Sequence, residues 1–185
     1  MSVIQLTWLA LALVWIAFEA RLAFLTRVKT ATHHSDKTIW LVIVATIMAA
    51  LALKQQHWWV LPIPLPIRQL LALSLFLTGL AVRGYALITL GRFFSTCIVL
   101  QQEHELITTG PYRLIRHPAY TGLLCAFAAA GLAMGDGLAL LCLCLPITYI
   151  LIQRINVEEQ CLLGYFGNAY QRYQQHTKKL LPWLY

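Results

Sequence analysis

Charged residues are scarce in this sequence. Only 11% of its 185 residues are Asp, Glu, Lys or Arg, whereas a soluble domain of ordinary composition carries about 25%. Hydrophobic residues make up 59% of the chain, and the mean hydropathy is +0.67. So little charge cannot give a soluble globule its polar surface, and the sequence therefore predicts an integral membrane protein.

Three other features are missing, and each absence excludes a class of protein. Met1-Ser2-Val3-Ile4 lacks the basic residues of a cleavable signal, so we expect the first apolar run to remain as an anchor. No two of the five cysteines have CxxC spacing, which indicates neither a zinc site nor a disulfide framework, and we predict no metal ligands. Lys and Arg are scattered between apolar runs rather than gathered on one face, which argues against nucleic-acid binding.

Five apolar runs are long enough, or nearly so, to cross a bilayer, for which a helix needs about 20 residues. Between the second and third runs, Trp58, Trp59 and three prolines predict a loop on the bilayer surface. The turn at 135–137 is so short that the last two runs should form an antiparallel hairpin. The five runs cover residues 3–25, 38–53, 69–90, 119–134 and 138–153.

Polar residues return after Arg154. Apolar residues recur there at helical spacing among Glu158 and Glu159, which predicts an amphipathic helix that leaves the membrane or lies on it. Gly164 and Gly167 are candidates to interrupt or end this helix. The fold class is thus an all-α integral membrane protein, with about five transmembrane helices and a cytoplasmic or interfacial C-terminal helical segment. We treat it as a single membrane domain in which residues 1–68 are scaffold.

The distribution of Lys and Arg predicts the orientation. With five spans, ten of these residues fall on one side and only Lys54 and Arg68 on the other, while Arg21 and Arg83 lie within spans. Because cytoplasmic loops are enriched in Lys and Arg, we expect the N-terminus outside and the C-terminus in the cytoplasm. The ten are Arg27, Lys29, Lys37, Arg92, Arg113, Arg116, Arg154, Arg172, Lys178 and Lys179.

The segment 110–122, GPYRLIRHPAYTG, places a polar cluster at the mouth of the fourth span. Pro118 suits the first turn of that helix, and His117 is then the capping residue. The start of a helix attracts anions, and Arg113 and Arg116 would strengthen that attraction. The alternative is an interfacial basic pair that contacts lipid headgroups beside a capping histidine.

Two further features allow either a structural or a functional interpretation. A connection of about 27 residues precedes the fourth span, long enough for a binding loop, although His104 within it could be a solvated loop residue. Arg154 and Glu158 lie four apart on one helix face, where they could simply form an ion pair. In the functional interpretation, Arg154 grips a carboxylate and Glu158 accepts hydrogen bonds from ribose hydroxyls or an ammonium group.

The order of these motifs resembles the isoprenylcysteine carboxyl methyltransferase family, whose plan is shared by membrane phospholipid methyltransferases. The resemblance covers about residues 90–183 and includes Gly-Pro-Tyr, Arg-His-Pro-x-Tyr-x-Gly, an apolar hairpin, Arg-x-x-x-Glu-Glu, Phe-Gly-x-x-Tyr and Leu-Pro. It implies methyl transfer from S-adenosylmethionine to a lipophilic acceptor, with the cofactor in a cytoplasmic pocket roofed by the C-terminal helix. Residues 69–185 would then be the methyltransferase core.

The resemblance also implies the roles of individual residues. Arg154 corresponds to the residue that grips the acceptor. Glu159 or His117 would remove a proton if the acceptor were a phenol or an amine. The cofactor-contacting positions of the family correspond to His104, Glu105, Leu106, Ile107, Tyr112, His117, Pro118, Ala119, Tyr120 and Glu158.

Several functions remain open at this point. The favoured one is carboxyl O-methylation of an isoprenylcysteine-like or other lipid-like carboxylate, taken from the bilayer as a lipophilic small molecule or lipidated substrate. The alternatives are a phospholipid N-methyltransferase, a lipid phenol O-methyltransferase, an NADPH-dependent membrane reductase indicated by Arg-His-Pro-Ala-Tyr alone, and a non-catalytic lipid-binding protein. The sequence specifies neither the acceptor nor the oligomeric state.

Overall fold

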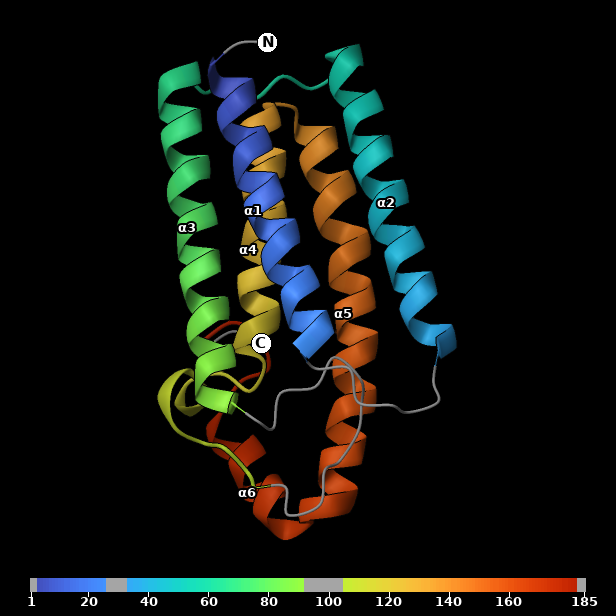
Figure 1. Cartoon of the computed structure of the whole chain (residues 1–185), viewed down its shortest axis with the longest axis vertical. Coiled ribbons are helices and arrows are strands. Elements are labelled where there is room, and N and C mark those ends of the chain that lie inside the picture. Colours follow the sequence, from blue (N-terminus) through green and yellow to red (C-terminus); the bar gives the residue numbers. More distant parts are fainter. Residues whose placement is uncertain (1–2, 26–32, 92–104, 183–185) are drawn as a thin grey trace.

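A computed structural model describes residues 3–25, 33–91 and 105–182, and within these ranges the chain is built from helices without a strand. The long helices run side by side along the long axis of the molecule (Figure 1). The predicted all-α fold is confirmed. The helices are α1 (Val3–Leu25), α2 (His33–Gln56), α3 (Leu65–Leu90), the short 3-10 helix η2 (Gly110–Arg113), α4 (Pro118–Met134), α5 (Gly137–Phe166) and α6 (Asn168–His176).

The first four predicted spans each coincide with or lie within one helix. The run at 3–25 is α1, and the runs at 38–53 and 119–134 lie within α2 and α4. α3 begins at Leu65, earlier than the predicted start at residue 69, because proline is tolerated in its first turn. The proline-rich segment therefore includes the start of α3, with Pro64 as the N-cap residue and Pro66 in the first turn.

The residues after Arg154 are helical as predicted, but they do not form an element of their own. Those residues continue the fifth span in a single helix of 30 residues, α5. Gly164 does not interrupt it; the helix ends at Phe166, where Gly167 adopts a positive φ of 52°. The polar residues that follow form α6, as the further helical turns predicted there. In Figure 1, α5 projects beyond the other long helices and carries α6 at its end.

α3 and α4 pack closely because each presents a glycine to the other. A Cβ atom at Gly79 would lie 2.7 Å from the Gly122 carbonyl oxygen, and one at Gly122 would lie 2.5 Å from the Gly79 carbonyl oxygen. Small residues of this kind allow membrane helices to approach at the backbone. α1 lies against the same pair, with Trp8 and Trp15 packed on Phe76 at centroid distances of 6.0 and 5.6 Å.

The predicted hairpin of the fourth and fifth spans is confirmed, and its turn also holds the loop before α3. The Asp136 carboxylate accepts from the Ala139 N–H at 3.0 Å, which caps α5, and from the Trp59 N–H at 3.2 Å. The Gly137 N–H in turn donates to the Trp59 carbonyl at 2.8 Å. The loop is thus docked on the turn, while the Trp58 side chain stays exposed.

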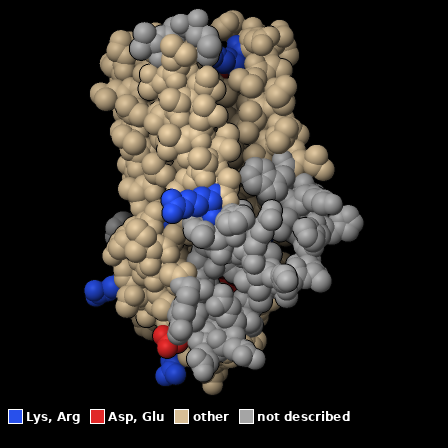
Figure 2. Space-filling model, viewed as in Figure 1, with Lys and Arg blue, Asp and Glu red and all other residues tan. Residues whose placement is uncertain are grey.

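The helices of the bundle expose many large apolar side chains. On the face shown in Figure 2, charged atoms are few along most of the bundle and appear mainly toward the end that carries α6. Among the described residues, α1, α3 and α5 are long and apolar enough to cross a membrane, and Leu41–Gln56 and α4 are shorter apolar helices. The chain is therefore a multi-pass membrane protein, and the total of five spans stays a prediction.

Candidate functional site

The short helix η2, which precedes α4, is held from both sides. Tyr112 of η2 is buried; its hydroxyl donates to the Ala86 carbonyl of α3 at 3.4 Å, and its carbonyl accepts from the Tyr173 hydroxyl of α6 at 2.6 Å. Burial raises the pKa of both phenols, so each stays a protonated donor at neutral pH. The short helix is thereby fixed between α3 and α6.

The start of α4 has the predicted form. His117 is the N-cap residue and Pro118 lies in the first turn, fully buried. A tail formed by residues 177–180 runs beside this start. The Arg116 N–H donates to the Lys178 carbonyl at 2.7 Å, the His117 N–H donates to the Lys179 carbonyl at 3.0 Å, and Ile115 forms a parallel bridge with Lys178. The C-terminal end of the described chain therefore lies against the motif at 110–122.

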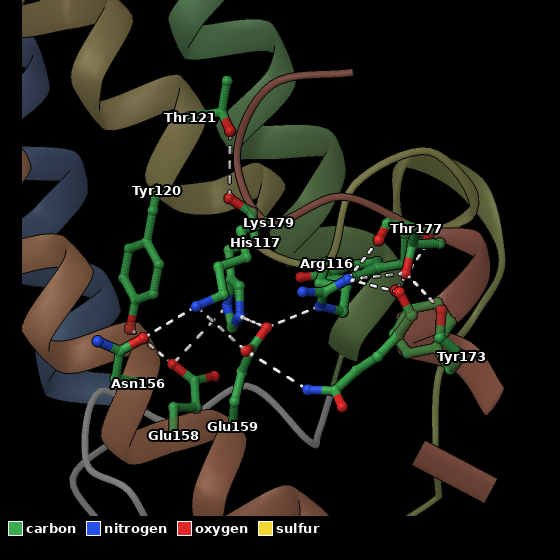
Figure 3. A network of polar contacts seen from close by, with 12 residues as sticks. Arg116, His117, Tyr120, Thr121, Asn156, Glu158, Glu159, Tyr173, Thr177 and Lys179 are labelled. Carbon is green, nitrogen blue, oxygen red and sulfur yellow. Dashed lines mark hydrogen bonds and ion pairs between the residues drawn. The ribbon is translucent and has the colours of Figure 1, made fainter. Parts of the chain in front are cut away.

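The Glu159 cluster, defined as Arg116, His117, Glu159 and Lys179, is the closed half of the polar network (Figure 3). The Glu159 carboxylate accepts from Arg116 Nε at 2.7 Å, contacts His117 Nε2 at 3.3 Å and lies 3.6 Å from Lys179 Nζ. The Arg116 and Glu159 side chains are only 8% and 9% exposed. Ionised side chains can be buried when they are paired and hydrogen-bonded, as these two are.

Arg116 also ties α6 and the tail to this cluster. Its Nη1 donates to the carbonyl oxygens of Gln174 and Thr177. The alternative of a basic pair at lipid headgroups is therefore wrong for Arg116, which is buried among protein groups, whereas Arg113 is exposed.

The Glu158 cluster, defined as Tyr120, Arg154 and Glu158, is the open half. The Tyr120 hydroxyl donates to Glu158 Oε2 at 3.0 Å and accepts from Arg154 Nε at 2.9 Å. The Glu158 side chain is 33% exposed, and its Oε2 lies 4.0 Å from His117 Nδ1. As predicted, Arg154 and Glu158 lie on one face of α5, and the Tyr120 hydroxyl lies between their charged groups.

His117 joins the two clusters. Its ring is 4% exposed, faces Glu159 with one nitrogen and Glu158 with the other, and stacks on the Tyr120 ring at a centroid distance of 5.7 Å. Figure 3 shows the two glutamates approaching this ring from α5. The motif at 110–122 and the segment around 154–159 therefore form one composite site.

The other predicted cofactor residues are Ala119 and residues 104–107. Ala119 is in the first turn of α4, and its carbonyl accepts from Arg83 Nη1 of α3 at 2.9 Å. Glu105, Leu106 and Ile107 lie on the segment that enters η2, with Glu105 exposed and the other two half-buried. His104 lies outside the described residues.

Sequence reasoning missed the contribution of the tail and of α6. Lys179 Nζ donates to Asn156 Oδ1 at 2.9 Å, and the Leu180 carbonyl accepts from Thr121 Oγ1 at 2.6 Å. The Gln174 side-chain amide also reaches Glu159 at 3.4 Å. The only signal for these contacts was the polar and aromatic composition after residue 168, which does not indicate a partner.

The arrangement can bind a ligand that carries groups of both charges. Glu158 offers a partly exposed carboxylate for hydroxyl or ammonium donors, and Arg154 brings a guanidinium to the same tyrosine hydroxyl. A guanidinium is suited to a carboxylate through two parallel hydrogen bonds. In the Glu159 cluster the charges are paired with one another, and the cluster holds the surrounding segments.

Comparison with known proteins agrees with this geometry. Residues 71–164 match the family described as the isoprenylcysteine carboxyl methyltransferase (ICMT) family. Protein-S-isoprenylcysteine O-methyltransferases B and A of Arabidopsis thaliana are 29% and 30% identical to the chain, each over 132 residues, or 70% of it. The match includes every residue of the Glu158 cluster.

A solved structure has the same fold. The structure of the eukaryotic intramembrane Ras methyltransferase ICMT aligns with 84% of this chain at a TM-score of 0.60 and 24% sequence identity. The matched region covers 55% of that chain, and 63% of the length of each of the two plant proteins. The chain therefore corresponds to a little over half of these longer relatives.

Proposed function

The chain belongs to the isoprenylcysteine carboxyl methyltransferase family, and from this premise we propose that it is a membrane methyltransferase that uses S-adenosylmethionine to methylate a carboxylate on a lipophilic acceptor. The observation that carries the proposal is the Glu158 cluster, in which one tyrosine hydroxyl links a partly exposed carboxylate to a guanidinium. The relatives' names supply the reaction class, and the cluster supplies residues that fit it.

The residues fit the cofactor by the chemistry of their donors and acceptors. S-adenosylmethionine carries an ammonium group and ribose hydroxyls, for which the Glu158 carboxylate is a suitable acceptor. His117 and Tyr120 form a stacked aromatic pair beside that carboxylate, with their orientation fixed by Glu159 and by Arg154. We therefore assign Glu158, Tyr120 and His117 to cofactor binding, together with the preceding residues 104–107 and 112.

The chain's own residues act by positioning. When bound, S-adenosylmethionine supplies a methyl group on a sulfonium, which is electrophilic without further activation. An acceptor carboxylate is ionised at neutral pH, so no proton has to be removed. Arg154 would hold that carboxylate, and the hydrogen bond from Arg154 Nε to Tyr120 fixes the guanidinium for this task.

The surroundings of Glu159 favour a carboxylate acceptor over a phenol or an amine. Those acceptors need a general base, and Glu159 and His117 are the candidates. Both oxygens of Glu159 face cations or amide donors, which stabilise its ionised form and make it a weak proton acceptor. His117 Nε2 is itself engaged with Glu159 at 3.3 Å. These contacts support a clamping role for Glu159 and no proton transfer.

Membership of this family argues against the alternative function as an NADPH-dependent reductase, because that alternative was based on the Arg-His-Pro-Ala-Tyr motif alone.

The proposed function is tested with the purified protein in lipid nanodiscs. S-adenosylmethionine at saturating concentration should raise the thermal unfolding temperature, because a ligand that binds the folded state stabilises it, and NADPH should not. The absence of any stabilisation at millimolar S-adenosylmethionine would overturn the proposal.

The acceptor class is tested separately with radiolabelled S-adenosylmethionine and a short isoprenylated cysteine that has a free carboxylate. A methyl ester releases volatile methanol in base, whereas an N-methyl product keeps its label. We expect base-labile product. Base-stable label on a phospholipid amine would instead support the N-methyltransferase alternative.

A further inference from the structure

An ion pair between a buried Arg83 and a half-buried Glu19 connects α1 with α3. Arg83 Nε donates to Glu19 Oε1 at 2.6 Å and Nη2 donates to Glu19 Oε2 at 2.8 Å, a bidentate pair whose side chains are 8% and 21% exposed. The Arg83 guanidinium also lies 6.0 Å from the Trp15 ring centroid. Charged residues within membrane helices are costly and usually functional.

The third nitrogen of this guanidinium reaches the candidate site. Arg83 Nη1 donates to the carbonyl oxygen of Ala119 at 2.9 Å. Ala119 lies between Pro118 and Tyr120 in the first turn of α4, and Tyr120 belongs to the Glu158 cluster. The three residues Glu19, Arg83 and Ala119, which we term the charged relay, thus link α1 to the backbone that carries the site.

Gly122 allows α4 to approach Arg83 closely, because glycine has no Cβ atom. A Cβ atom at this position would lie 2.8 Å from both the Cβ and the backbone nitrogen of Arg83. The backbone of α4 therefore rests directly against that of α3 at the level of Arg83. A substitution that shifts the Arg83 side chain would therefore also shift the first turn of α4, because close-packed helices have no free space to absorb the movement.

A neutral counterpart joins the same three helices at the opposite end of the bundle. Trp8 Nε1 of α1 donates to Gln69 Oε1 of α3 at 2.6 Å, and Gln69 Nε2 donates to the Ala133 carbonyl of α4 at 3.0 Å. An uncharged amide is thus sufficient to tie α1, α3 and α4 together. A charged relay, with its higher cost of burial, occurs at the end that carries the site.

We propose that Glu19 and Arg83 are positioning residues, which fix the first turn of α4 and thereby hold Tyr120 and His117 in the geometry that binds the cofactor. This proposal rests on the proposed function. It assigns a role in the site to α1, the helix predicted as scaffold, and to Glu19, which lies outside the residues matched by the family. The carboxylate orients the guanidinium, and the guanidinium holds the Ala119 carbonyl.

The test compares variants of the two ties in lipid nanodiscs. Arg83→Lys keeps a cation beside Glu19, so the half-buried carboxylate stays paired, but a single nitrogen cannot replace the separate contacts of the guanidinium fork. Glu19→Gln removes the charge that orients Arg83. Gln69→Leu is the matched control, because it breaks the neutral tie between the same helices far from the site. Each variant is measured for its unfolding temperature without ligand and for its Kd for S-adenosylmethionine.

We expect Arg83→Lys and Glu19→Gln to raise the Kd for S-adenosylmethionine about tenfold, a loss of about 1.4 kcal/mol. Gln69→Leu should lower the unfolding temperature and leave the Kd within about twofold of the unaltered protein. If Glu19→Gln does not fold, Arg83→Lys decides the question. Equal Kd values for Arg83→Lys, Gln69→Leu and the unaltered protein would overturn the positioning role while the proposed function stands. If the unaltered protein itself does not bind S-adenosylmethionine, the proposed function fails and the positioning role fails with it.

Discussion

Glu158 and Glu159 are consecutive in the sequence but lie in different surroundings. Glu158 is partly exposed and contacts a tyrosine hydroxyl, whereas Glu159 is buried among Arg116, His117 and Lys179. A helix turns by about 100° per residue, so neighbours on α5 face different partners. Under the proposed function, the same residue type would bind the ligand at position 158 and hold the structure of the site at position 159.

This difference predicts distinct effects for the two Glu→Gln substitutions. Glu158→Gln should raise the Kd for S-adenosylmethionine about tenfold through loss of a charge-assisted contact, and should change the free energy of unfolding by less than about 1 kcal/mol. Glu159→Gln leaves buried Arg116 without its carboxylate and should destabilise the protein by about 3 kcal/mol. Thermal unfolding and cofactor titration of both variants check this, and equal destabilisation by the two would contradict the assignment.

The sequence could predict part of this residue-level arrangement. The spacing of four between Arg154 and Glu158 predicted one face, and Pro118 predicted the start of α4, because both follow from helix geometry alone. Tyr120, by contrast, contacts Arg154, which is 34 positions away, and Glu158, which is 38 positions away. The contacts of Arg116 with the tail span up to 61 positions. Local patterns contain no information on such pairs.

At the scale of helices, apolar length predicted the elements but not all of their ends, and the largest difference is at the end of α5. The change of composition at Arg154 marks where the apolar run ends, but backbone hydrogen bonds continue across that point and α5 extends to Phe166. Gly164 is tolerated because a glycine costs a helix only about 1 kcal/mol. The continuity of α5 matters for the site, since it holds Arg154, Glu158 and Glu159 on one rigid element.

The contact between α3 and α4 gives a prediction at the same scale. Gly79→Ala and Gly122→Ala would each place a Cβ less than 3 Å from the backbone of the facing helix, and each should destabilise the protein by about 1–3 kcal/mol. Gly84→Ala, on the same helix α3, is the control: its Cβ would meet no atom within 4 Å. That variant should be neutral or more stable by up to about 1 kcal/mol, since alanine favours helix.

Thermal unfolding of the three alanine variants in one detergent checks the packing. Gly122→Ala should in addition weaken cofactor binding, because its Cβ would also meet the Cβ and the backbone nitrogen of Arg83 and would displace α4 from that residue. Equal unfolding temperatures for Gly79→Ala, Gly122→Ala and the Gly84→Ala control would contradict close packing at Gly79 and Gly122.

Across the whole molecule, segments that are distant in the sequence meet at one end of the bundle. That end carries the start of α4, the projecting part of α5, α6 and the tail, while most of the remaining described exterior on the face in view is uncharged (Figure 2). The membrane class followed from composition, because composition determines which solvent the surface suits. The charged relay and the tail contacts did not, since they depend on how helices are placed in space.

The orientation of this polar end is the last prediction. Ten Lys and Arg residues against two place it in the cytoplasm and the loop before α3 outside. Single cysteines are introduced as Gln55→Cys, at the exposed end of α2, and Gln171→Cys, on the exposed face of α6, in a background without the five native cysteines. A membrane-impermeant maleimide applied to intact cells should label Gln55→Cys alone, and permeabilised cells should show labelling of both. The reverse pattern in intact cells would place the candidate site outside, where S-adenosylmethionine made in the cytoplasm could not reach it, and would count against the orientation and the proposed cofactor together.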